Sequence, residues 1–143
     1  MAKSKSIKII LDVNWLISAS INASSRKKFE ALLLNERFIF CVCVQLLNEY
    51  DDVIKRPVFS NKIKPAEIAE FRNIFLERSE VFGISIIKKV VRDVKDDYLI
   101  ALAKKSKADF LITGDKDLLV LKKTGKTEIT TLSDFLQRFF SPK

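Results

Sequence analysis

The sequence predicts an α/β fold, a three-layer sandwich in which helices flank a central, mainly parallel β-sheet. Short apolar runs alternate along the chain with longer segments of helical apolar spacing, which is typical of parallel α/β proteins. The β-branched run from Ile7 to Leu11 fits a central strand. The apolar run from Phe110 to Thr113, bounded by a glycine turn, fits a strand buried on both faces. The 143 residues contain no repeat and no Gly/Pro/Ser-rich linker, so we expect a single domain over residues 1–143.

The first half of the chain contains two predicted strands and three predicted helices. The third helix ends before Pro57, because proline disfavours helical geometry in the residue that precedes it. Apolar side chains at helical spacing identify each helix. The expected elements are a strand over 7–11, a helix from Trp15, a helix capped by Ser24 or Ser25, a strand over 38–43 and a helix over 44–56.

The second half repeats the same alternation. Pro65 suits the first position of a helix, where its missing N–H group has no partner to lose. Asp96 and Asp97 suit a helix start, because the helix dipole favours negative charge there. The expected elements are a helix from Pro65 that ends by Gly83, a strand over 84–87, a helix from Asp96, a strand over 110–113, a helical turn over 118–121, a strand near 128–130 and a helix over 133–140.

The composition narrows the range of functions. A formal net charge of +8 and a pI near 9.5 favour an anionic partner, and nucleic acid is favoured over a general lysine bias. The chain has no histidine, which excludes Ser-His-Asp and Cys-His nucleophiles and histidine-containing zinc sites. Cys41 and Cys43 are read as small buried side chains. The N-terminal segment fits neither a signal peptide nor a membrane span, so we expect a cytoplasmic protein with no membrane partner.

Acidic residues follow the predicted strands and begin a predicted helix. If the first strand and the Phe110 strand are neighbours, Asp12 and Asp115 emerge at the same sheet edge, where ligands bind in open α/β sheets, and Asp97 lies close by. Several carboxylates within a few ångströms require a compensating cation or proton uptake, and Mg²⁺ or Mn²⁺ fits an all-oxygen ligand set. The alternative is that Asp96 and Asp97 only cap a helix and that 114–117 is a polar turn.

The helix over 44–56 adds a further acid, but its periodicity leaves the choice open. Glu49 and Asp51 fall on opposite borders of the apolar stripe at about 100° per residue, and Asp52 lies well outside it. Periodicity alone does not decide between Glu49 and Asp51.

Three segments together resemble the PIN-domain nucleases, most closely the toxins of prokaryotic type II toxin-antitoxin pairs. The segments are Ile10 to Ala19, Leu46 to Pro57 and Lys95 to Leu119, and the last is the most specific. The resemblance implies that Asp12, Glu49, Asp97 and Asp115 are the metal-binding and catalytic acids, which resolves the choice at Glu49. It implies accessory metal roles for Asp96 and Asp117 and supporting hydrogen bonds from Asn14 and Thr113. The family commonly has Asp-Thr-Asn-Val where this chain has Asp12-Val13-Asn14-Trp15.

The resemblance also implies an activity and partners. We expect a Mg²⁺- or Mn²⁺-dependent endoribonuclease that hydrolyses RNA phosphodiester bonds and leaves a 5′-phosphate, with a cognate antitoxin protein as partner and a homodimeric assembly. Two alternatives remain open. The acids at the strand ends also fit a phosphoacceptor signalling domain, and a PIN-like chain could be a non-catalytic RNA- or partner-binding module.

Overall fold

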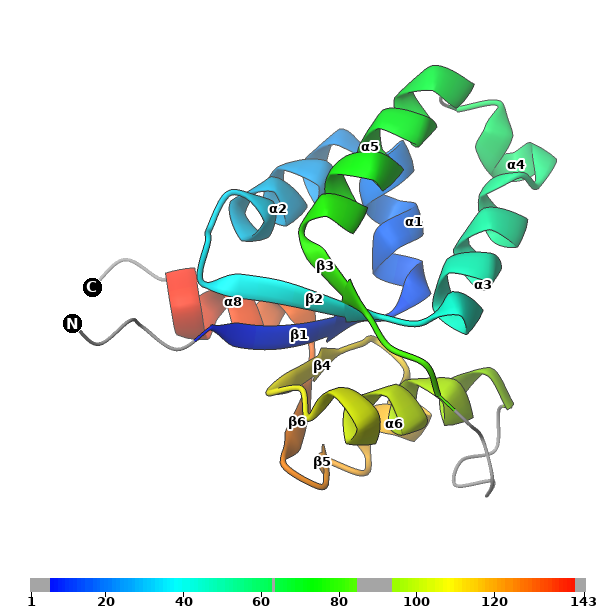
Figure 1. Cartoon of the computed structure of the whole chain (residues 1–143). Helices are drawn as coiled ribbons and strands as arrows, with labels where there is room; N and C mark the ends of the chain where they lie inside the picture. The colour runs from blue at the N-terminus through cyan, green and yellow to red at the C-terminus, as the bar shows by residue number, and fades with distance from the viewer. Residues whose placement is uncertain (1–5, 63, 85–93, 141–143) are drawn as a thin grey trace.

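A computed structural model describes residues 6–62, 64–84 and 94–140, except for the side chains of residues 60 and 94–97 (Figure 1). It contains a six-stranded sheet of order β3-β2-β1-β4-β6-β5. All neighbouring strands are parallel except β5 and β6, which form an antiparallel hairpin. The strands are β1 (Ile7–Leu11), β2 (Phe38–Val42), β3 (Ser79–Val81), β4 (Phe110–Ile112), β5 (Lys123–Thr124) and β6 (Thr127–Thr130).

Strand β1 lies in the middle of the sheet, as the sequence predicts. Ile9 pairs in register with Phe40 of β2 on one side and with Phe110 of β4 on the other. Because side chains alternate along a strand and parallel neighbours in register point the same way, these three side chains share one face of the sheet. All three are buried. The predicted mainly parallel α/β fold is therefore confirmed.

Helices cover both faces of this sheet. Phe29 of α2 and Phe75 of α5 contact Phe40, so α2 and α5 lie on the face that carries Phe40. Figure 1 shows α1, α2, α3 and α5 together above β2, with α6 in the lower part of the view. The helices are α1 (Val13–Ile21), α2 (Ala23–Leu33), α3 (Val44–Ile54), α4 (Pro57–Ser60), α5 (Pro65–Glu77), α6 (Val94–Ser106), α7 (Lys116–Leu119) and α8 (Leu132–Phe140).

An aromatic cluster joins the last helix to the sheet. The ring of Phe135 in α8 is fully buried, and its centroid lies 5.6 Å from that of Phe38 and 5.2 Å from that of Phe110. Such edge-to-face pairs add to the free energy gained by burying the rings. Helix α8 is therefore part of the same core as β2 and β4.

Three local expectations differ from the structure. The helix from Pro65 was expected to be ended by Gly83, but α5 ends at Glu77, and β3 lies between them. The third strand was expected over 84–87, but β3 is Ser79–Val81, and Gly83 follows it. Residues 85–87 lie outside the described part of the chain, and Ile84 is not in a strand. Ser24 or Ser25 was expected to cap α2, but the N-cap residue is Asn22. The side-chain oxygen of Asn22 accepts hydrogen bonds from the backbone N–H groups of Ser24 and Ser25.

The buried cysteines agree with their sequence interpretation. Cys41 and Cys43 are both fully buried and form no disulfide, and burial raises the pKa of the Cys41 thiol to about 11. Within the described ranges, no helix has the length and apolar character needed to cross a bilayer.

Candidate active site

Asp12 lies at the carboxyl end of β1, where it caps helix α1. Its Oδ1 atom accepts the backbone N–H of Asn14 at 3.1 Å, and its Oδ2 atom accepts the hydroxyl of Thr113 at 2.6 Å. The side chain of Asn14 is exposed, so this residue contacts Asp12 through its backbone. Asp12 is 6% exposed and Thr113 is fully buried, so the two side chains form a fixed polar pair between β1 and the end of β4.

The turn after β4 brings Asp115 to the same edge of the sheet. The hydroxyl oxygen of Thr113 accepts the backbone N–H of Asp115 at 3.0 Å, so Thr113 contacts both Asp12 and the turn that carries Asp115. Asp115 caps α7, and its Oδ1 atom accepts the N–H of Asp117 at 2.8 Å. Asp117 lies in the first turn of α7 and is half-buried.

Glu49 reaches this region from α3. The hydroxyl of Tyr98, near the start of α6, donates a hydrogen bond to Glu49 Oε1. Tyr98 is 5% exposed. Burial and the neighbouring Glu49 carboxylate raise the pKa of Tyr98 above its ordinary value, so the phenol stays protonated and remains a donor.

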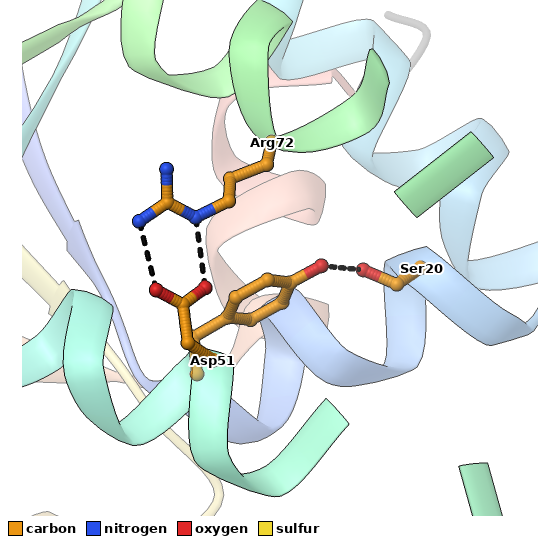
Figure 2. A network of polar contacts seen from close by, with 4 residues as sticks. Ser20, Asp51 and Arg72 are labelled. Carbon is orange, nitrogen blue, oxygen red and sulfur yellow. Dashed lines mark hydrogen bonds and ion pairs between the residues drawn. The ribbon is translucent and has the colours of Figure 1, made fainter. Parts of the chain in front are cut away.

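Asp51, the other acid that helical periodicity allowed, pairs with an arginine of α5. The guanidinium of Arg72 in α5 donates from Nε and from a terminal nitrogen to the two carboxylate oxygens of Asp51, at 2.8 and 2.9 Å (Figure 2). A bidentate pair of this kind fixes both side chains. Asp51 therefore joins α3 to α5, whereas Glu49 faces α6.

The remaining predicted acids are Asp96 and Asp97. Both belong to the first turn of α6, but their side chains lie outside the described part of the structure. Tyr98 follows them in the same helix.

Electrostatic coupling joins three acids that are far apart in the sequence. Burial raises the pKa of the Asp12 carboxyl most strongly, and the charges of Glu49 and Asp115 raise it further. The hydrogen bonds from Thr113 and Asn14 act in the opposite direction, because they stabilise the carboxylate. The site therefore concentrates negative charge in a partly desolvated place.

The donor chemistry of these residues fits a hard divalent cation. Carboxylate oxygens are the ligands that Mg²⁺ and Mn²⁺ prefer, and a cation would offset the mutual repulsion of Asp12, Glu49 and Asp115. Among the side chains that the structure describes, no three acids are grouped closely enough to hold a metal. Asp97 is not among those side chains.

Comparisons with known proteins identify the family and support the fold. A family model described as "PIN domain" matches residues 8–117. The chain belongs to the PIN-domain family. A PIN domain is generally a nuclease. No curated protein matches the chain.

The fold of this PIN domain is similar to that of a solved toxin-antitoxin complex. A chain of the crystal structure of VapBC2 from Rickettsia felis, bound to a DNA fragment from its promoter, matches with a TM-score of 0.55 and 18% identity. The match covers 86% of this chain and 97% of that chain. At this identity the likeness supports the fold.

Tyr98 is the site residue of this PIN domain that the sequence interpretation missed. The buried hydroxyl of a tyrosine generally has a hydrogen-bond partner, and Tyr98 directly follows two acids in a helix whose next residues are buried. These features of the sequence could have identified Tyr98 as a residue of the site. The partner itself depends on how α3 and α6 pack, which a linear pattern does not encode.

Proposed function

We propose that this PIN domain is a metal-dependent endoribonuclease and the toxin of a toxin-antitoxin pair. The observation that carries the proposal is the coupling of Asp12, Glu49 and Asp115, which come from β1, α3 and the turn after β4. Membership of a generally nucleolytic family and a net charge of +8 support a polyanionic substrate.

In this proposal Asp12, Glu49, Asp97 and Asp115 hold one or two Mg²⁺ or Mn²⁺ ions, with Asp96 and Asp117 as accessory ligands. The bound ion would activate a water molecule for attack and place positive charge beside the scissile phosphate. Thr113 keeps the Asp12 carboxylate oriented by its 2.6 Å hydrogen bond, and Tyr98 does the same for Glu49. Fixed ligand orientation matters because outer hydrogen bonds tune metal affinity.

The proposed partners are RNA, a cognate antitoxin and a second copy of the chain. The likeness to a chain of the VapBC2 complex supports the antitoxin. We expect a small open reading frame for it directly beside the gene, and we expect its product to block the acidic site. RNA as the substrate and the homodimer rest on the resemblance in sequence.

RNA cleavage by the purified protein tests the proposal. We expect cleavage of single-stranded or structured RNA with Mg²⁺ or Mn²⁺, and loss of cleavage with chelator or in Asp12→Asn. Asp51→Asn is the control, because Asp51 pairs with Arg72 and should leave cleavage intact. Cleavage that persists in chelator or in Asp12→Asn would remove the acids from the mechanism.

A second candidate is a non-catalytic RNA- or partner-binding module. It is favoured by the finding that no three described acids are grouped at metal-binding spacing. RNA binding with undiminished affinity in Asp115→Asn, together with no cleavage in any divalent ion, would select this candidate.

A further inference from the structure

Five exposed lysines lie at the end of α6 and at the start of β5, two elements that contact each other. Helix α6 packs beside β5, and both lie in the lower part of Figure 1. The buried hydroxyl of Thr127 donates to the carbonyl oxygen of Ala108 at 2.7 Å, which fixes the hairpin to the chain that leaves α6. We name this group the lysine surface; its members are Lys104, Lys105, Lys107, Lys122 and Lys123.

Asp109, two residues after Lys107, and Glu128, which pairs with Lys123 across the hairpin, already have partners. Asp109 pairs with Lys126 at 3.3 Å and also accepts the backbone N–H of Lys8 at 2.9 Å. Glu128 pairs with Arg138 at 2.8 Å. Within the described ranges, no ion pair joins a lysine of the surface to an acid. The surface therefore presents positive charge that the neighbouring acids do not neutralise.

Two of these lysines occupy a backbone conformation that disfavours them. Lys107 has φ 56° and Lys122 has φ 61°, and they are the non-glycine residues with positive φ among those described. Lys107 follows the last residue of α6, and its N–H bonds to the Ala103 carbonyl at 3.0 Å, a helix end where glycine or asparagine is usual. Left-handed geometry costs an ordinary side chain free energy that glycine avoids, so local backbone stability does not account for lysine at either place.

Helix stability alone explains only part of this pattern. Lys104 and Lys105 lie in the last turn of α6, where cations interact favourably with the helix dipole. The helix dipole does not account for Lys107 and Lys122, whose positive φ values disfavour lysine. Binding of an anion outside the protein explains all five.

We propose that the lysine surface holds the phosphate backbone of RNA whose scissile bond lies at the carboxylate site. This inference rests on the proposed ribonuclease function. Helix α6 connects the two places, because its first turn carries Asp97 and its last turn carries Lys104 and Lys105. Its 13 residues span about 20 Å. Only an RNA longer than about 20 Å can occupy the lysine surface and the carboxylate site at the same time.

The test replaces Lys107 and Lys122 with asparagine, which removes the charge and tolerates positive φ. Binding is measured by fluorescence anisotropy in chelator, with a labelled unstructured RNA of about 16 nucleotides, so that no cleavage is needed. Each lost phosphate contact lowers the slope of log K against log salt by about 0.7 for a single strand, so the double variant should lose about 1.4. At about 0.1 M salt this corresponds to roughly 25-fold weaker binding. We expect the melting temperature to stay the same or rise.

The control is Lys27→Asn/Lys28→Asn, which removes two exposed lysines from α2 and so makes the same change in net charge. The proposal predicts little loss of affinity in this variant, and little effect of Lys107→Asn/Lys122→Asn on the binding of a dinucleotide, which is too short to reach both places. Equal losses in the two double variants would overturn the proposal, because net charge alone would then explain them. A lower melting temperature for Lys107→Asn/Lys122→Asn would contradict the argument from backbone conformation.

A duplex DNA of the same length separates RNA from other polyanions. Weaker binding of DNA by the double variant with unchanged binding of RNA would overturn the proposal in favour of a DNA-binding surface. Because binding is measured without metal, failure of the nuclease proposal is seen separately, as an absence of cleavage by the wild-type protein.

Discussion

Tyr98 donates its hydroxyl hydrogen to Glu49, and this bond joins the start of α6 to α3 across 49 positions of the sequence. The bond couples the helix whose first turn contains Asp96 and Asp97 to the helix that carries Glu49. In the proposed site, Tyr98 acts through Glu49, as a positioning residue.

Tyr98→Phe should therefore weaken metal binding while the fold is retained. Outer hydrogen bonds to metal ligands are typically worth about tenfold or more in metal affinity, so we expect roughly tenfold weaker Mn²⁺ binding by titration calorimetry. Electron paramagnetic resonance of bound Mn²⁺ should also change, which a merely structural role would not produce.

The other tyrosine provides a matched control. Tyr50 is also buried, and its hydroxyl bonds to Ser20 at 2.6 Å. Tyr50→Phe should lower the free energy of unfolding by about 1 kcal/mol and leave Mn²⁺ affinity unchanged. Equal Mn²⁺ affinity in Tyr98→Phe and wild type would contradict the positioning role.

A second prediction separates the two acids of α3. Glu49→Gln should abolish or strongly weaken Mn²⁺ binding with little loss of stability. Asp51→Asn should leave Mn²⁺ binding unchanged and lower the free energy of unfolding by about 1 kcal/mol, because it breaks the pair with Arg72. The expected loss is no larger because Asp51 and Arg72 are each about one third exposed, and solvent weakens such pairs. Urea unfolding and Mn²⁺ titration of both variants check this; a loss of metal binding in Asp51→Asn would reverse the assignment.

These two acids also show where sequence reasoning reaches its limit. The strand β1 and the helices α3 and α5 follow from local patterns, because burial leaves an apolar run or stripe in the sequence. Glu49 and Asp51 both border the stripe of α3, and only the packing of α5 and α6 decides which acid meets which partner.

The position of β3 was not predicted, for a different reason. It is a three-residue edge strand, and Glu80 and Val81 are exposed, so no alternation marks it. Ile84, Ile86 and Ile87, which follow it in the sequence, form a β-branched run that predicts a strand more strongly. Asp12 and Asp115 could be placed together because the carboxyl ends of adjacent parallel strands share an edge, a rule that needs only the strand order.

A third prediction concerns pH. Burial and the charges of Glu49 and Asp115 raise the pKa of Asp12 in the folded protein above its value of about 3.9 in an unfolded chain. Between these two pKa values the folded state binds more protons, so the contribution of Asp12 to stability falls as pH rises. Asp12→Asn lacks this titration. In chelator, we expect its stability relative to wild type to increase from pH 4 to pH 7.

Urea unfolding at several pH values measures this difference. Carboxylates that do not interact with Asp12 titrate alike in both proteins and cancel in the comparison. A difference that stays constant or shrinks with rising pH would contradict the raised pKa. Added Mn²⁺ should stabilise wild type more than Asp12→Asn, because the wild-type carboxylate is the proposed ligand.

A fourth prediction tests whether α8 belongs to the core. Phe135 is fully buried, and its ring lies 4.7 Å from Phe139 as well as against Phe38 and Phe110. Phe135→Ala should lower the free energy of unfolding by about 3–5 kcal/mol, because it leaves a cavity among these rings. The family model ends at residue 117, so α8 lies beyond it, yet it packs against β2 and β4.

The site lies at the carboxyl ends of β1 and β4, whereas Phe38 and Phe110 are the first residues of their strands. Phe135→Ala should therefore keep wild-type Mn²⁺ affinity at temperatures where it is folded. Phe140→Ala is the control, because this ring is 37% exposed and its loss should cost far less. If Phe135→Ala unfolds like wild type, α8 contributes little to the core, and the residues after 117 act as an appendage to the PIN domain.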